Sequence, residues 1–198
     1  RSAFAILRAL RIKDTNMTTS SDKGFPRWLI LLGVLTAIGP LSIDMYLPAF
    51  PQIERSLGGL PGSVELTLAS FFIGLTFGQL FYGPLSDRFG RKKPLYLGLA
   101  IYTLASIGAA FAPSIPALIV CRFLQGMGGC AGIIIPSAIV RDRTTARESA
   151  RAFSLLMLVM GLAPILAPLI GGGLLTQWGW RGIFGLLALY GGACLVAI

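Results

Sequence analysis

The sequence predicts an all-α membrane protein, and three observations support this fold class. Hydrophobic residues make up 55% of the 198-residue chain and charged residues only 13%, and the mean hydropathy is +0.76. The 12 prolines and 25 glycines recur inside the apolar stretches, which membrane helices tolerate and soluble cores seldom do. Most of the 17 Lys and Arg residues gather in a few polar segments outside those stretches. These features disfavour a soluble enzyme.

Six apolar stretches are each long enough to cross a bilayer, which takes about 20 residues. They cover residues 28–50, 64–86, 94–112, 116–139, 152–175 and 181–198. We expect residues 27–198 to form one bundle of six transmembrane helices, cut in or just after helix six because the final run has no polar stop. Residues 1–26 are expected to be a cytoplasmic tail, with residues 1–16 either upstream of a start at Met17 or added sequence. An amphipathic surface helix is an alternative for that tail.

The basic residues predict the topology, because Lys and Arg are held on the cytoplasmic side during insertion. Placing the N-terminal segment through Arg27 and two basic breaks, residues 87–93 and 141–151, in the cytoplasm accounts for 14 of the 17 basic residues. The N-terminus is then cytoplasmic, and six spans return the C-terminal end to the same side. Two groups of three helices with opposite orientation give the 3+3 inverted repeat found in many transporters.

The composition gives little indication of a catalytic site or a metal site. There is no histidine, and Cys121, Cys130 and Cys194 lie in apolar runs without metal-ligand spacing. The net charge of +9 resides mainly in the tail and the polar breaks, which favours the positive-inside pattern over nucleic-acid binding. The predicted membrane interior holds one acid, one arginine and scattered hydroxyls. We therefore expect a transporter and not an enzyme, with no cofactor.

That acid and that arginine are Asp44 and Arg122, which lie well inside predicted spans. Such residues cost at least about 2.5 kcal/mol at a helix centre on insertion scales, and they mark functional sites by default. With a rise of about 1.5 Å per residue, both lie roughly 6 to 10 Å below the outer ends of their helices, so they can approach each other or share one cavity. One interpretation is a static ion pair that holds helices together. The other is that Asp44 gains and loses a proton and thereby couples proton movement to transport.

The run "GPLSDRFGRKK" joins the second and third predicted helices. A basic loop alone satisfies the positive-inside rule, but Asp87 stands at a helix C-terminus, where the helix dipole disfavours an anion. It fits there if it faces another helix N-terminus or a neighbouring arginine, and Gly83 and Gly90 allow a close approach and a tight turn. The run closely resembles the loop signature of the major facilitator superfamily, through Gly83, Leu85, Asp87, Arg88, Gly90, Arg91, Lys92 and Lys93. The resemblance implies a cytoplasmic gate, in which Asp142 is the expected partner of Arg91 or Arg88.

The fourth predicted helix carries a second pattern of this kind, "LIVCRFLQGMGGC". It resembles a motif of the same superfamily through Leu118, Arg122, Gln125, Gly126 and Gly128. The small residues alone would indicate only that helices pack closely. The resemblance further implies that Arg122 takes part in proton coupling.

The fifth predicted helix contains "LVMGLAPILAPLIGGG", which is similar to the superfamily's antiporter motif. The matching residues are Pro168, Gly171 and Gly172. Three other glycine places of the motif are filled by small residues, Ser154, Ala163 and Ala167. Close packing and a kink at Pro164 or Pro168 are still expected. The structural alternative is a kinked helix that serves packing only.

The membrane part, residues 27–198, looks like the Bcr/CflA drug-resistance subfamily of drug:proton antiporters, most clearly in "GPLSIDMYLPAFPQI" and "GWRGIF". This resemblance implies the N-terminal half of a twelve-helix exporter in the bacterial inner membrane, driven by the proton gradient. The implied partners are drugs of the bicyclomycin, chloramphenicol or sulfonamide kind, protons, the lipid bilayer and the missing C-terminal half, with no nucleic acid.

Weaker candidates for polar contacts in a central cavity are Tyr46, Gln79, Tyr82 and Gln125. Interhelical hydrogen bonding is the alternative role for each of them. Two other functions remain open from the sequence. One is a proton-linked uptake carrier for a small metabolite, and the other is a truncated half that transports nothing by itself.

Overall fold

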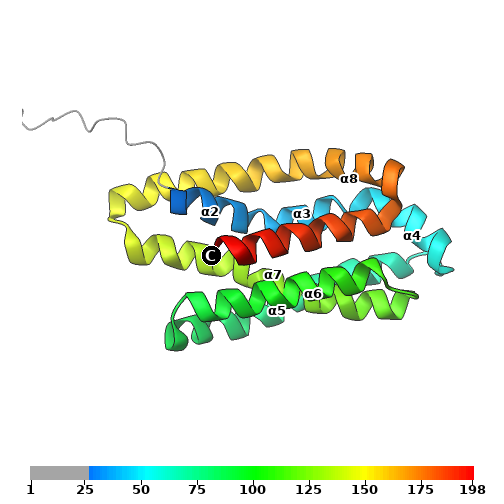
Figure 1. The fold of residues 1–198 in the computed structure, drawn as a ribbon, viewed down its shortest axis with the longest axis horizontal. Coiled ribbons are helices and arrows are strands. Elements are labelled where there is room, and N and C mark those ends of the chain that lie inside the picture. Colours follow the sequence, from blue (N-terminus) through cyan, green and yellow to red (C-terminus); the bar gives the residue numbers. More distant parts are fainter. Residues whose placement is uncertain (1–26) are drawn as a thin grey trace, which may run out of the picture.

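A computed structural model describes residues 27–198. The described part is helical, and its long helices lie side by side along the long axis of the molecule (Figure 1). The predicted tail, residues 1–26, lies outside the described residues. The helices are α2 (Arg27–Thr36), α3 (Ile38–Asp44), η1 (Leu47–Ala49), α4 (Phe50–Leu57), α5 (Ser63–Phe89), α6 (Lys92–Ala110), α7 (Ile115–Arg143) and α8 (Ala146–Ala197).

The first predicted span is broken into short helices. Pro40 has no N–H to donate to the carbonyl of Thr36, so the hydrogen-bond ladder is interrupted where α2 gives way to α3. Pro48 and Pro51 then occupy first-turn positions of η1 and α4, where a missing N–H costs nothing. The first predicted stretch ended at residue 50, so the helical structure extends beyond the predicted span. The helix continues to Leu57 and ends at Gly58, in the left-handed conformation with φ 64°.

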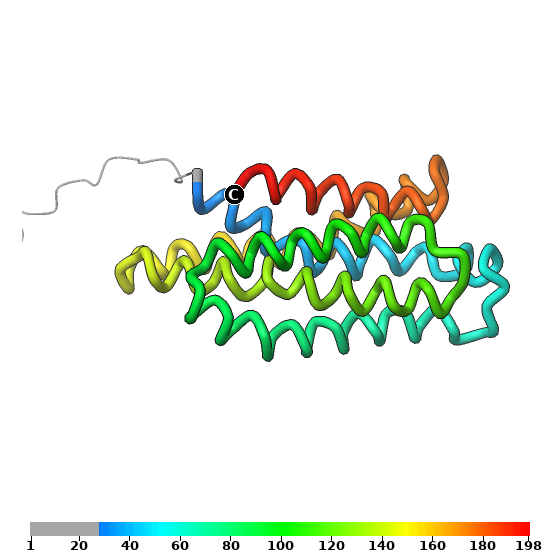
Figure 2. The backbone as a smooth tube through the Cα atoms, turned by 60° about the horizontal axis from the view of Figure 1, so that its bottom comes forward, coloured from blue at the N-terminus to red at the C-terminus, as the bar shows by residue number. Residues whose placement is uncertain are grey.

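Helix α7 packs against both α5 and α6, as the two views agree (Figures 1 and 2). Its contact with α5 depends on small residues. A Cβ atom at Gly74 would collide with the backbone of Phe123, and one at Gly126 would collide with the backbone of Phe71. The two helices thus approach backbone to backbone, as small residues permit between membrane helices.

Helix α8 is 52 residues long, about twice the length needed to cross a membrane. It is divided at Gly179, whose φ of 69° and ψ of −176° are not helical, and the chain folds back there (Figure 1). This break falls between the predicted spans 152–175 and 181–198. Pro164 and Pro168 lie inside the first arm, and the one residue of α8 with non-helical dihedral angles is Gly179, not either proline.

The fold-back of α8 is held by side chains of α4. The Oε1 atom of Gln52 accepts a 2.8 Å hydrogen bond from the backbone N–H of Trp180. The indole Nε1–H of Trp180 donates to Ser56 Oγ at 2.8 Å. The Gln52 bond satisfies the first N–H of the part of α8 that follows Gly179, and the Ser56 bond holds the Trp180 side chain, so α4 fixes where this second arm begins.

The helices turn at two ends of the bundle, which we call the basic end and the opposite end. The basic end carries residues 87–93 and 141–151, together with the start of α2 and the C-terminal end of the chain (Figures 1 and 2). The opposite end carries α4, the α6–α7 connection and Gly179. By length and apolarity, four helical stretches of the described residues can cross a membrane: Trp28–Leu57, Ser63–Phe89, Ile115–Arg143 and Ala146–Ala197.

Candidate functional site

The centre of the site is Arg122 on α7, whose side chain is fully buried. Helix α7 begins with an N-cap at Ser114 and a proline in its first turn, which places Arg122 about two turns into the helix. The residues around it come from α3, from the turn between α3 and η1, from α5 and α6, and from the part of α8 that follows Gly179. A guanidinium carries five N–H donors and stays charged, so its burial requires acceptors around it.

The Nη1 atom of Arg122 donates two hydrogen bonds. It reaches the backbone carbonyl of Ser42 at 3.1 Å and Oε1 of Gln125 at 2.7 Å. The Ser42 carbonyl is free to accept because the Tyr46 N–H, its α-helical partner, bonds to Ile43 one residue later. The break at the end of α3 thus creates the acceptor, and the negative end of the α3 dipole favours the cation.

Three aromatic rings surround the same guanidinium. The Cζ atom of Arg122 lies 4.5 Å from the ring centroid of Tyr46, 4.2 Å from that of Phe71 and 5.9 Å from that of Phe184. A desolvated cation–π contact contributes about 2 kcal/mol, so the rings offset part of the cost of burying the charge. Within the described residues, the Nε and Nη2 atoms of Arg122 have no hydrogen-bond partner. Each such donor costs about 1–3 kcal/mol, so Arg122 is incompletely satisfied.

A chain of buried hydrogen bonds extends from Arg122 to α6. The amide of Gln125 donates to Ser106 Oγ at 2.8 Å, and Ser106 donates to the carbonyl of Tyr102 at 2.7 Å. The Tyr102 and Ser42 hydroxyls share a 2.7 Å hydrogen bond, which brings the chain back to α3. The cluster therefore links α3, α6 and α7 through one connected set of polar groups.

Asp44 lies two residues beyond Ser42, at the C-terminal end of α3, and is half-buried. The static ion pair between Asp44 and Arg122 that the sequence left open is not formed. The two ion pairs among the described side chains both belong to Arg91, and Arg122 takes the Ser42 carbonyl instead. The structure thus brings the Asp44 segment to Arg122 without joining their charges.

The four weaker candidates have different environments. Tyr46 is buried against the guanidinium, and its hydroxyl shares a hydrogen bond with Thr67 Oγ1 at 2.5 Å. Gln125 bonds Arg122 directly. Tyr82 is buried in the core away from these contacts, beside Gly98. Gln79 is exposed on α5 and forms none of the side-chain hydrogen bonds found in residues 28–198. Tyr46 and Gln125 are thus the two that share the Arg122 site.

A second cluster lies at the basic end, around Arg91. Its Nε atom donates to Asp142 Oδ2 at 2.8 Å, and its Nη1 atom donates to Asp87 Oδ1 at 2.8 Å. The Nη1 atom also donates to the Ser86 hydroxyl. The hydrogen bond to Asp142 is the main reason that the pKa of Arg91 is raised above its ordinary value. Arg91 and Arg88 were the two expected partners of Asp142, and the ion pair in the structure is with Arg91.

The other residues of the "GPLSDRFGRKK" run have separate roles, and only Gly90 is required by the turn itself. Gly90 has a φ of 80° and ends α5, as a tight turn requires. Arg88 lies with its Cζ atom 5.4 Å from the ring centroid of Phe89, and Lys92 donates from Nζ to the carbonyl of Ile198 at 2.9 Å. The expected close approach at Gly83 does not occur within the described residues, since an added Cβ there meets no atom within 4 Å.

The residues of the antiporter motif lie in the first arm of α8. Gly171 is buried, and a Cβ there would collide with the backbone of Met45, just beyond α3. Gly172 has open space around it, and Pro168 is half-buried. Of the three residues, Gly171 therefore brings this arm against the broken first helix that carries Asp44.

Sequence reasoning missed two rings of the site and its backbone acceptor. Phe71 and Phe184 could not be told from lipid-facing phenylalanines, because both stand in continuous apolar runs. The Ser42 carbonyl has a usable signal in Pro40 and Pro48, since paired prolines around one segment indicate a broken helix with free carbonyls.

Comparison with known proteins gives the family. The model of the Major Facilitator Superfamily matches residues 30–198. An uncharacterized MFS-type transporter of Bacillus subtilis, YdgK, is 45% identical over 163 residues, which are 81% of this chain and 40% of that protein. A bicyclomycin resistance protein homolog of Haemophilus influenzae is 37% identical over 164 residues, 83% of this chain and 41% of that protein. Multidrug resistance protein D of Escherichia coli is 36% identical over 156 residues, 79% of this chain and 40% of that protein.

The chain belongs to the Major Facilitator Superfamily, because the family model matches well over half of it. Together with the four apolar helices, this makes it a multi-pass membrane protein of a transporter family. The matched region spans about two fifths of the length of these curated relatives.

Proposed function

We propose that the chain is the N-terminal half of a proton-coupled exporter of drugs. The relatives named for resistance to bicyclomycin and to multiple drugs support export of such compounds. The main supporting observation is the buried Arg122. Two of its N–H-bearing atoms lack a hydrogen-bond partner within the described residues, and its guanidinium contacts the end of the helix that carries Asp44. A buried, incompletely satisfied charge is costly to keep, and in membrane proteins such residues mark ion and substrate pathways.

The proposed architecture has six membrane passes arranged as a 3+3 inverted repeat. Helices α2 to α4 make the first pass, α5, α6 and α7 the next three, and the two arms of α8 the last two. The basic end is cytoplasmic under the positive-inside rule, which places the N-terminus inside in the bacterial inner membrane. A second half of six helices completes the transport cavity, and the relatives' length supports this.

In the proposed mechanism, Asp44 carries the transported proton. In one state, deprotonated Asp44 moves to the Nε and Nη2 donors of Arg122 that lack a partner within the described residues. In the other, protonated Asp44 stays apart from Arg122 and the guanidinium keeps the Ser42 carbonyl, which is the arrangement of the present structure. The short helix α3 lies between two breaks, so it can shift as a unit between these arrangements. Drug binding then competes with the proton for Asp44, and the proton gradient supplies the energy.

The Arg91 cluster is proposed as the cytoplasmic gate. Arg91 ties the end of α5 to the end of α7 through Asp87 and Asp142, and all three side chains are partly or fully exposed. Exposed ion pairs contribute only about 0–1 kcal/mol, which suits a contact that must open and close in each cycle. The bonds of this cluster are thus weak enough to be remade at each turnover.

The proposal is tested by replacing Asp44 with asparagine in the complete open reading frame that contains this chain. Cells producing the Asp44→Asn variant should lose drug resistance, and inverted membrane vesicles should lose proton-driven drug uptake. Glu54→Gln, which changes an acid outside the Arg122 site, is the matched control and should keep both activities. Unchanged resistance and unchanged proton coupling in Asp44→Asn would overturn the proposal. Accumulation of drug by whole cells would show uptake in place of export.

A further inference from the structure

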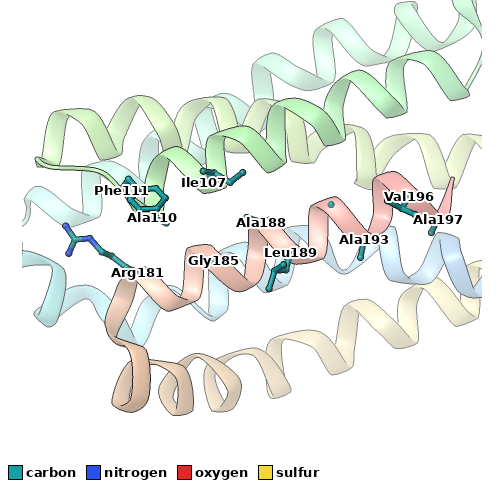
Figure 3. A pocket seen from close by; sticks show the side chains of 11 residues that line it. Ile107, Ala110, Phe111, Arg181, Gly185, Ala188, Leu189, Ala193, Val196 and Ala197 are labelled. Atoms are coloured by element: carbon teal, nitrogen blue, oxygen red, sulfur yellow. The ribbon is translucent and has the colours of Figure 1, made fainter.

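An apolar groove runs along the outside of the bundle between α6 and the second arm of α8 (Figure 3). It has a volume of about 1020 Å³. Small residues of α8 leave this space, namely Gly185, Ala188 and Gly192. Bulkier apolar residues border it, namely Ile107, Phe111 and Leu189. An added Cβ at Gly185 or Gly192 would meet no atom within 4 Å, so nothing in the described chain fills the groove.

One charge lies in this lining, at the end of the groove next to Phe111 (Figure 3). The Arg181 guanidinium donates to the carbonyl of Ala112 at 3.3 Å and lies with its Cζ atom 4.2 Å from the Trp180 ring centroid. It takes part in neither of the ion pairs found within residues 28–198. A fork of five donors with one neutral acceptor leaves positive charge and free N–H groups at the mouth of an apolar groove.

The neighbouring residues place Arg181 at the membrane surface. Trp178 is 68% exposed and Trp180 precedes Arg181 directly, and tryptophan is enriched where membranes meet water. From Arg181 to Gly192 the helix axis advances about 16 Å, close to one leaflet of a hydrocarbon core about 30 Å thick. The groove thus descends from headgroup level through one leaflet of the membrane.

We infer that the α6–α8 groove binds one anionic phospholipid. The phosphate or anionic headgroup pairs with Arg181, and one acyl chain lies along the small residues of α8. Charge complementarity at the mouth and apolar lining along the groove match the two parts of this ligand. A second copy of the chain could bury the apolar part, but it would leave Arg181 without an anion. The inference is independent of what the protein transports.

Native mass spectrometry of the delipidated complete protein in detergent tests this site. Phosphatidylglycerol and phosphatidylcholine with the same acyl chains are titrated separately. Arg181→Gln should weaken phosphatidylglycerol binding about fivefold, the factor expected for one basic residue near an anionic lipid surface, and leave phosphatidylcholine binding unchanged. Gly192→Leu should weaken both lipids because it fills the shared acyl path.

Matched controls carry the same substitutions elsewhere. Arg147→Gln removes an exposed arginine at the basic end, and Gly161→Leu adds a side chain at another glycine with open space around it. Both should bind each lipid as the unmodified protein does. Phosphatidylglycerol binding that is unaffected by Arg181→Gln or by Gly192→Leu would overturn the inference. A dimer that Gly192→Leu converts to monomer would also overturn it and assign the groove to a second copy.

Discussion

Replacing Gln125 with leucine should destabilise the bundle far more than the same change at Gln79. Gln125 is fully buried, accepts a hydrogen bond from Arg122 Nη1 at 2.7 Å and donates one to Ser106 Oγ at 2.8 Å. Leucine fills a similar volume but makes neither bond. The change therefore removes polar contacts from the Arg122 site without opening a large cavity.

The size of the effect follows from the two lost bonds. A hydrogen bond to a charged group contributes about 1.5–3 kcal/mol and a neutral one about 0.5–1.5 kcal/mol in soluble proteins. Side-chain hydrogen bonds between membrane helices average about 0.6 kcal/mol, because the unfolded state in the membrane also finds partners. Since one partner here is a fully buried guanidinium, we expect a loss of about 2 kcal/mol, toward the upper part of the membrane range.

The assay is reversible unfolding in mixed micelles, followed by circular dichroism, for both variants. Gln79 is exposed and outside the hydrogen bonds of the described side chains, so Gln79→Leu should change stability by no more than about 0.5 kcal/mol. Adding Arg122→Met to Gln125→Leu should recover part of the loss, because the guanidinium then no longer lacks acceptors. Equal stability of the two leucine variants would refute the assigned role of Gln125.

Other regions of the structure give further predictions. Gly126→Leu should prevent α5 and α7 from packing and abolish folded protein on size-exclusion chromatography, whereas Gly161→Leu should elute normally. Asp142→Asn should lower the free energy of unfolding in micelles by less than about 1 kcal/mol, because the ion pair of Asp142 with Arg91 is exposed. The loss should be smaller still at high salt, which screens exposed charges. A large loss that does not depend on salt would contradict this. Glu148 accepts hydrogen bonds from Thr145 at the start of α8, and these lower the pKa of Glu148 below its ordinary value. Ionised Glu148 therefore stabilises the folded protein at pH values above the unfolded-state pKa, and this contribution is lost as the pH falls through the folded-state pKa. Melting curves of Glu148→Gln and the unmodified protein should thus differ at neutral pH and converge in acid, and a difference that persists in acid would oppose the assignment.

The helical segments of the described chain were largely predictable because their signals are local. The lengths of the apolar runs located the helices, and the clustered basic residues predicted that the two basic breaks lie at the same end of the bundle. Helix α7 and the fold-back of α8 lie where these signals predicted them. The extent of α4 was missed because the first span was ended at residue 50, where the apolar run stops, although Pro51 occupies a first-turn position of this helix. Local composition does not distinguish a helix start from a loop when proline serves both.

The candidate site was predictable in its charged residues and not in its contacts. Arg122 stood out because an arginine in an apolar run is rare. Its partners depend on packing between segments far apart in the sequence. Phe71 and Phe184 have no charge or motif that marks them, and the prolines around Ser42 indicate a broken helix but not which side chain its free carbonyl meets. The sequence thus pointed to Asp44 as a partner for Arg122, whereas the backbone break supplied a carbonyl in its place.

Proton release on drug binding tests the role of Asp44 most directly. The complete protein, purified in weakly buffered detergent solution, is mixed with a drug that it exports, and the pH change is followed with an indicator dye. The proposed mechanism predicts that the unmodified protein and Glu54→Gln release protons and that Asp44→Asn binds the drug without releasing any. Equal proton release by Asp44→Asn and the unmodified protein would contradict the proposal that Asp44 carries the transported proton.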